Sequence, residues 1–242
     1  MHKYLRQAIE SNQEDGYLKY HAPRYDYLLD LLHRYFTGEE DILEIGRTSF
    51  TGIISRSLGA SIDTLGFEAD GETEAGHHYQ FDLNDAQYRE AWREDLPGYD
   101  IIVFAEVIEH LYTSPERVLN FLKSLLKERG IIIIQTPNAV ALHKRIKMML
   151  GKNPYHLIPE KRDGANHYRE YTADELANYC RAAGFSVEEQ IFKNYFDYRY
   201  RNHGLGPTNY SAKTRRYYLL NLLFDLLPSS LRPGLCFVIR AE

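Results

Sequence analysis

Three short runs of apolar residues, broken only by Glu44 in the first, constrain the fold of this chain most. They read ILEI at 42–45, IIVF at 101–104 and IIII at 131–134. Strands of this kind belong to parallel sheets covered on both faces, whereas a strand with one wet face alternates polar and apolar residues. Helical spacing fills the stretches between them, and this order predicts βαβ units. We therefore expect an α/β fold: a doubly wound, Rossmann-like, mostly parallel sheet with helices on both faces.

Apolar spacing and turn residues predict the individual elements. Strands are expected at 41–46, 61–67, 78–81, 99–104, 131–134, 185–192 and 236–239. Helices are expected at 17–36, 50–58, 86–92, 107–127, 139–150, 172–183 and 214–227. We expect one domain over 1–242, divided into an N-terminal helical segment (1–40), a core (41–192), a C-terminal cap insertion (193–235) and a last strand (236–240).

Composition excludes several classes of protein. With 44% apolar residues, 20 Tyr and 11 Phe among 242 residues, the chain is not intrinsically disordered. No apolar run reaches the roughly 20 residues that a membrane-spanning helix needs, and the N-terminus shows no signal peptide, so a cytoplasmic location is expected. The two cysteines, Cys180 and Cys236, lack metal-ligand spacing and are expected to be buried thiols.

The charges are distributed unevenly along the chain. Residues 68–116 carry 2 basic and 13 acidic side chains, while residues 117–242 carry 20 basic and 11 acidic ones. This division argues against a uniform nucleic-acid-binding surface. It favours a site with an acidic wall and a basic wall, and therefore a small-molecule substrate, with an anionic or sugar-like one as the narrower expectation.

Candidate site residues lie where the predicted strands end, because ligands of open α/β sheets bind at the carboxyl edge. Glu68 follows the second strand, where a carboxylate suits the two hydroxyls of a ribose. Asp82 follows the third strand and suits an adenine amino group. Gly46 follows the first strand, and its missing side chain lets a ligand approach the backbone.

Several of these segments together resemble a known family. ILEIG, YDIIVFAEVIEHL, KERGIIIIQTPN and HYREYTADEL followed by RAAGF are similar to class I S-adenosylmethionine-dependent methyltransferases over about 40–192. The resemblance implies S-adenosyl-L-methionine as cofactor. It implies that Glu44 and Gly46 line the methionine end, that Glu68 holds the ribose, and that Asp82 and Leu83 face the adenine. It also implies that Ala105 and Glu106 border the methionine and the substrate.

The first loop departs from the family's E-x-G-x-G-x-G pattern. Thr48 and Phe50 stand at two of the three glycine positions. Thr48 is still expected to offer its hydroxyl or amide to the amino-acid part of the cofactor. A branch associated with sugar and polysaccharide gene clusters carries a similar loop. A catalytically degenerate binding module is the main alternative, and a nucleotide-dependent oxidoreductase is a weaker one because G-x-G-x-x-G is missing.

The segment EVIEH supplies a candidate base. If it opens a helix, its spacing places Glu106, Glu109 and His110 on one face above the fourth expected strand. His110 is then a general base for a substrate hydroxyl. Two alternatives remain: Glu109 and His110 hold neighbouring loops in place, or the group binds a divalent cation, for which the helix alone supplies few ligands.

The segment HYREY, just before an expected helix, supplies a second candidate base. His167 is expected above the end of the fifth strand, with Tyr168 and Arg169 as substrate contacts. The alternative is structural: Arg169 and Glu170 pair with each other, and His167 hydrogen-bonds within its loop.

The C-terminal half carries basic and apolar segments of less specific meaning. The basic helix at 139–150, including Lys144, is expected to present a solvated face more readily than an anion site. The Tyr- and Arg-rich stretch 193–218 favours a lid or a homodimer contact over nucleic acid. The apolar helix at 217–227 is expected to pack on the sheet or on a second subunit rather than on a membrane surface. The expected reaction is O-methylation of a small molecule such as a sugar or glycoconjugate precursor.

Overall fold

The computed structural model describes residues 1–12, 16–157, 167–200 and 215–242, excluding the side chains of residues 216 and 217. Its strands in this part of the chain are β1 (Ile42–Ile45), β2 (Ile62–Gly66), β3 (Gly71–Glu72), β4 (His77–Gln80), β5 (Tyr99–Ala105), β6 (Leu126–Pro137), β7 (Phe185–Lys193) and β8 (Gly234–Ala241). Its helices are α1 (Lys3–Ser11), α2 (Gly16–Tyr35), α3 (Thr51–Leu58), α4 (Pro115–Ser124), α5 (Leu142–Met149), α6 (Ala173–Ala182) and α7 (Arg215–Leu226).

The strands form one sheet in the order β3-β4-β2-β1-β5-β6-β8-β7. The strands β4, β2, β1, β5 and β6 are parallel, while β8 runs antiparallel between β6 and β7. Successive parallel strands extend outwards from β1 in one direction and from β5 in the other. The strand order therefore reverses between β1 and β5, which is where ligands bind in open α/β sheets. The predicted fold class is confirmed.

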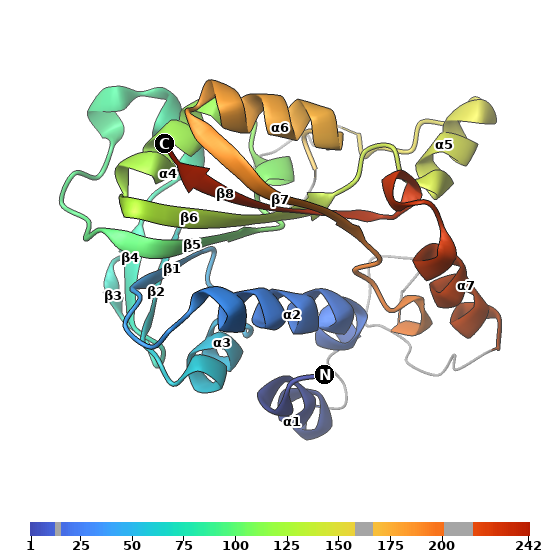
Figure 1. Cartoon of the computed structure of the whole chain (residues 1–242), viewed down its shortest axis with the longest axis horizontal. Helices are drawn as coiled ribbons and strands as arrows, with labels where there is room; N and C mark the ends of the chain where they lie inside the picture. Colours follow the sequence, from blue (N-terminus) through green and yellow to red (C-terminus); the bar gives the residue numbers. More distant parts are fainter. Residues whose placement is uncertain (13–15, 158–166, 201–214) are drawn as a thin grey trace.

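Alternate residues of each apolar run reach opposite faces of the sheet. In β5, Ile101 and Val103 pack with α2 and α3, whereas Ile102 and Phe104 pack with α4 and α6. Figure 1 shows the same division, with α4 and α6 above the sheet and α2 and α3 below it. Both faces are covered, and the apolar runs are explained by that burial.

The helix expected over 107–127 is wrong in its first half. Within residues 107–114, the only helical turn is a single 3₁₀ turn at Ile108–His110, and Leu111 is extended. The helix α4 begins at Pro115, with Ser114 as its N-cap. Proline lacks an amide hydrogen and its ring clashes with the carbonyl four residues earlier, so Pro115 favours a helix start here, although α2 accommodates Pro23 in its interior. The helical face expected for Glu106, Glu109 and His110 does not exist.

Other boundaries differ by less. The expected helix 86–92 is two 3₁₀ turns, Leu83–Gln87 and Arg89–Ala91, and the IIII run is the middle of the longer β6. The edge strand β3 was not expected. Both cysteines are free and buried, as predicted.

The expected cap contains a 3₁₀ turn at Tyr198–Tyr200 and the helix α7. Residues 201–214 of the cap, and residues 158–166 between α5 and α6, lie outside the described part of the chain. Figure 1 shows α5 and α7 beyond the carboxyl end of β6. Phe224 of α7 is buried and stacks on Tyr198, with ring centroids 5.0 Å apart. Four leucines of α7 are exposed, so this face does not pack on the sheet, and packing on a second subunit stays a prediction: Leu219, Leu222, Leu223 and Leu226. Among the described helices, none has the length and apolar character to cross a membrane.

Candidate active site

The loop between β1 and α3 carries Thr48 and Phe50 at two positions where the family has glycine. Gly46 has a φ of 84°, a left-handed conformation that glycine adopts without strain. The Thr48 hydroxyl accepts a hydrogen bond from the Phe50 amide at 3.1 Å, and the Thr48 amide donates to the Thr51 hydroxyl at 3.1 Å. Phe50 is buried and stacks on Tyr25 of α2, with ring centroids 4.0 Å apart. The loop is thus held by hydrogen bonds to two hydroxyl groups and by an aromatic contact. The hydroxyl and the amide of Thr48 both bond to residues 50 and 51.

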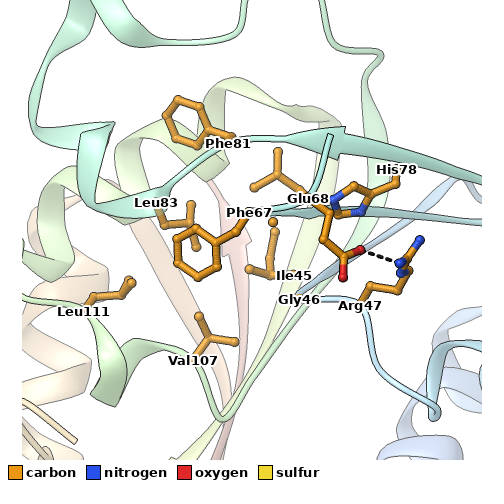
Figure 2. A pocket seen from close by; sticks show the side chains of 12 residues that line it. Ile45, Gly46, Arg47, Phe67, Glu68, His78, Phe81, Leu83, Val107 and Leu111 are labelled. Atoms are coloured by element: carbon orange, nitrogen blue, oxygen red, sulfur yellow. Dashed lines mark ion pairs between the residues drawn. The ribbon is translucent and has the colours of Figure 1, made fainter. Parts of the chain in front are cut away.

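A cavity of about 230 Å³ opens at the carboxyl ends of β1, β2 and β4 (Figure 2). Its apolar lining consists of Ile45, Leu65, Phe67, Phe81, Leu83, Val107 and Leu111. Its polar lining comprises Arg47, Glu68 and His78, beside the backbone of Gly46 and Gly66. The cavity thus places an apolar wall next to a carboxylate.

Arg47 and Glu68 form an ion pair in this cavity, with 2.5 Å between Arg47 Nη2 and Glu68 Oε2 (Figure 2). The pair joins the first loop to the end of β2. The sequence analysis placed Glu68 here but missed Arg47. Arg47 could have been found from the sequence, because it follows the first expected strand as Glu68 follows the second. Neighbouring parallel strands bring such positions together.

The other expected cofactor residues lie at their predicted strand ends. Leu83 lines the cavity, while Asp82 caps the 3₁₀ turn that follows it, accepting from the amide of Asn84 at 2.8 Å. Ala105 ends β5, and Glu106 has a φ of 56°. That left-handed conformation is uncommon for a residue with a side chain, and Arg129, with a φ of 64°, shares it.

A group of buried charges surrounds Arg24 of α2. Burial raises the pKa of Glu44 to about 7, although the Thr51 hydroxyl and the charge of Arg24 lower it. Burial also raises the pKa of Glu106 and of Glu109, which the charge of Arg24 opposes. Glu44 Oε2, Glu106 Oε1 and Arg24 Nε are buried without a hydrogen-bond partner among the described residues. Such atoms cost free energy unless a ligand satisfies them.

The two candidate histidines lie together beside Glu109. Donor atoms of Glu109, His110 and His167 lie within 4.8 Å of one another, and the two imidazole rings are perpendicular with centroids 4.8 Å apart. Glu109 is fully buried and accepts from the Thr136 hydroxyl at 2.9 Å. The Tyr168 amide donates to the Glu109 carbonyl at 2.8 Å. The helical spacing proposed for this cluster is wrong, but its members converge because the chain segment 167–171 is bound to the turn at 108–110.

The alternative in which Arg169 and Glu170 pair with each other is wrong in its partners. Arg169 pairs with Glu175 at 2.7 Å, because Glu175 lies at the start of α6. Glu170 instead pairs with Lys144 of α5, and its Oε1 lies 3.0 Å from His167 Nδ1. Lys144 is buried, so it does not belong to the solvated face expected for the basic helix. Burial, together with the charges of His110, His156 and Lys144, lowers the pKa of His167 to about 3.

These features fit the cofactor implied by the sequence. The apolar cavity wall suits an adenine ring, and the carboxylate of Glu68 suits a ribose. The unsatisfied buried atoms of Arg24, Glu44 and Glu106 suit an amino acid carrying both charges. The histidine cluster lies at the neighbouring strand end, where an acceptor substrate would meet the cofactor.

Comparisons with known proteins agree with this geometry. A protein family described as "Methyltransferase domain" matches residues 4–190. A curated relative, the ubiquinone biosynthesis O-methyltransferase of Glaesserella parasuis serovar 5 (strain SH0165), is 26% identical over 163 residues, which are 62% of this chain and 66% of that protein. The chain thus matches slightly less than two thirds of that relative's length.

Solved structures show the same fold. A SAM-dependent methyltransferase from Archaeoglobus fulgidus superposes with a TM-score of 0.53 and 16% identity, covering 89% of this chain and 94% of that one. An S-adenosylmethionine-dependent methyltransferase from Clostridium acetobutylicum gives a TM-score of 0.53 and 10% identity over 92% of each chain. Sheet order, cavity and family match lead to one conclusion: this chain belongs to the methyltransferase domain family and is a class I methyltransferase that uses S-adenosylmethionine.

Proposed function

We propose that this methyltransferase transfers its methyl group to a hydroxyl of a small molecule. The observation that carries the proposal is the cluster of His110 and His167 beside the buried Glu109. An alcohol or phenol must lose a proton as its oxygen gains the methyl group, and imidazole is the commonest side chain for that task. The named activity of the curated relative is also an O-methylation.

His110 is the stronger candidate for the base. An effective general base has a pKa near the working pH, whereas the pKa of His167 lies at about 3. His167 is therefore neutral and suited to accept a hydrogen bond from the substrate hydroxyl and hold it in place. Base catalysis contributes roughly 10²–10⁴-fold to such reactions. Alignment of oxygen and methyl group supplies much of the remaining acceleration.

Several residues would hold the cofactor, which when bound supplies an activated methyl group. Glu68, oriented by Arg47, would accept the ribose hydroxyls. Leu83 and the apolar cavity wall would contact the adenine, and Arg24 would pair with the carboxylate of the amino-acid part. Glu44 and Glu106 would contact its ammonium group.

The acceptor proposed is a sugar or glycoconjugate precursor. Its support is the similarity of the first loop to that of the sugar-cluster branch, together with the basic C-terminal half of the chain. A phenolic acceptor is the competing class, favoured by the name of the curated relative.

The test is to incubate the purified protein with S-adenosylmethionine and matched panels of nucleotide sugars and hydroxylated aromatics, and to measure S-adenosylhomocysteine release. Turnover with phenols alone would reject the sugar proposal. Absence of S-adenosylhomocysteine binding in calorimetry, by a folded protein, would reject the enzyme itself.

A divalent cation at Glu109, His110 and His167 is a second candidate mechanism, favoured by the 4.8 Å spread of their donor atoms. A carboxylate with two imidazoles is a common ligand set for first-row metals. Treatment with a chelator separates the candidates. Full activity afterwards supports the base mechanism, whereas a loss that added Mn²⁺ or Zn²⁺ restores supports the cation.

A further inference from the structure

We propose that Glu170 is a positioning residue, which fixes His167 as the tautomer protonated at Nδ1 and leaves Nε2 to accept a hydrogen bond from the substrate hydroxyl. The contact with substrate rests on the proposed function. The tautomer itself depends only on the protein.

The first support is a buried chain of three charged or titratable groups. Lys144 from α5 pairs with Glu170, and Glu170 Oε1 lies 3.0 Å from His167 Nδ1. The side chains of Lys144 and Glu170 are 8% and 9% exposed. The Lys144 ammonium also donates to the carbonyl of Asn138 at 3.1 Å, which anchors it at the end of β6.

The second support is the hydrogen-bond logic of these groups. Ammonium groups only donate and ionised carboxylates only accept. The ammonium of Lys144 favours the ionised form of Glu170, so the 3.0 Å contact requires a proton on His167 Nδ1. A neutral imidazole carries one proton, and Nε2 is then the acceptor of the ring. Carboxylates orient catalytic histidines in the same way in hydrolytic triads.

The third support is the location of the ring. His167 borders a cavity of about 400 Å³, with Tyr155, Tyr168 and Arg169 among its other lining residues. The ring also contacts His110 at 4.8 Å and His156 at 5.0 Å between centroids. His167 therefore lies between the second cavity and the candidate base, where an acceptor hydroxyl has to be oriented.

The chain contains a matched control pair. Glu72 Oε1 lies 3.0 Å from His77 Nδ1, the same atoms at the same distance as in the Glu170 pair. Glu72, however, is 85% exposed. Glu72 contacts His77 and not the site, and water competes for this exposed contact. Glu72→Gln is therefore expected to change neither the tautomer of His167 nor the activity.

The experiment is long-range ¹H–¹⁵N NMR of the full chain labelled with ¹⁵N-histidine, which distinguishes Nδ1–H from Nε2–H imidazole. His167→Gln assigns the signal. We expect Nδ1–H in the wild type and in Glu72→Gln, and a shift towards Nε2–H in Glu170→Gln. Glu170→Gln should also lower kcat at least 10-fold while changing S-adenosylhomocysteine affinity by less than 2-fold, and Glu170→Asp should recover part of the loss.

An Nε2–H wild-type ring, or an unchanged tautomer in Glu170→Gln, would overturn the positioning role. If Glu170→Gln does not fold, the double variant Lys144→Met/Glu170→Leu removes both buried charges, and the same tautomer shift is expected. A wild-type Nδ1–H ring combined with full turnover of His167→Gln would overturn the substrate contact alone. An Nδ1–H ring in a protein that methylates no hydroxyl would mean that the proposed function has failed, not the positioning.

Discussion

Arg47 contacts Glu68 across the mouth of the cofactor cavity, and the two residues come from loops that follow neighbouring parallel strands. Their carboxylate–guanidinium contact is partly exposed to solvent, so it orients Glu68 more than it stabilises the fold. The first prediction concerns how this orientation affects cofactor binding.

Glu68→Ala should weaken S-adenosylhomocysteine binding by roughly 10- to 100-fold, because hydrogen bonds to a charged group contribute about 1.5–3 kcal/mol each. Arg47→Ala should weaken it by less, up to about 5-fold, as expected for an exposed pair worth at most about 1 kcal/mol. Calorimetric titration measures both. Tighter binding by Arg47→Ala would mean that Arg47 competes with the ribose for Glu68. Glu74→Ala, at an exposed site, serves as the control.

Glu44 should make the stability of the ligand-free protein decrease as the pH rises. Its pKa is about 7 in the folded protein, above its ordinary value of 4.5. The unfolded chain therefore releases this proton first, and stability present below about pH 4.5 is lost progressively up to about pH 7. The difference in unfolding free energy between Glu44→Gln and wild type should grow by roughly 2–3 kcal/mol from pH 5 to pH 8.

Urea unfolding at several pH values measures this difference. A constant difference between the two proteins would show that Glu44 is ionised when folded. Because Glu44 is also proposed to contact the cofactor, the glutamine variant should be more stable at pH 8 and yet bind S-adenosylhomocysteine more weakly.

His110→Ala should lower kcat by roughly 10²–10⁴-fold, the usual contribution of a general base. His167→Ala should lower kcat at least 10-fold and also raise the acceptor KM, because a neutral imidazole aligns the hydroxyl without taking its proton. Steady-state kinetics at saturating S-adenosylmethionine separates the two effects. Near-full turnover by His110→Ala would remove it as the base, while unchanged cofactor affinity in both variants would confirm that they act on the acceptor side.

Phe50→Ala should destabilise the protein by about 3–5 kcal/mol, the usual cost of truncating a buried phenylalanine. Phe50 is 1% exposed and stacks on Tyr25, so its ring belongs to the core between α2 and α3. Thermal unfolding measures the effect. Phe50→Gly, which restores the family's usual residue, should be no more stable than Phe50→Ala; a more stable glycine variant would show that the loop is strained.

Much of the fold was predictable because its signals are local. Covered parallel strands are apolar at nearly every position, as ILEI (apart from Glu44), IIVF and IIII are, and turn residues mark their ends. The break at Pro115 had a local signal too, since proline favours the first turn of a helix over its interior, but the apolar spacing on either side obscured it. The edge strand β3 is two residues long and has no apolar pattern that predicts it.

The candidate site was predictable only in part. The position of Glu68 at the cavity follows from the rule that strand ends meet at one edge of the sheet, whereas that of Leu83 was implied by the resemblance to the family. The ion-pair partners of the charged side chains could not be predicted from the sequence. Arg169 was paired with its neighbour Glu170, whereas the structure pairs Glu170 with Lys144 of α5 and Arg169 with Glu175 of α6.

The sequence by itself thus determined the layered sheet, the family and the acidic residues at the strand ends, because each depends on neighbouring residues or on a repeating pattern. Only the tertiary structure decided which charges are buried and which groups they contact. Lys144, Glu170 and His167 come together because α5 and the segment 167–171 both pack at the carboxyl edge of the sheet. Desolvation then sets their charge states, and burial is a property of the folded chain that no single segment carries.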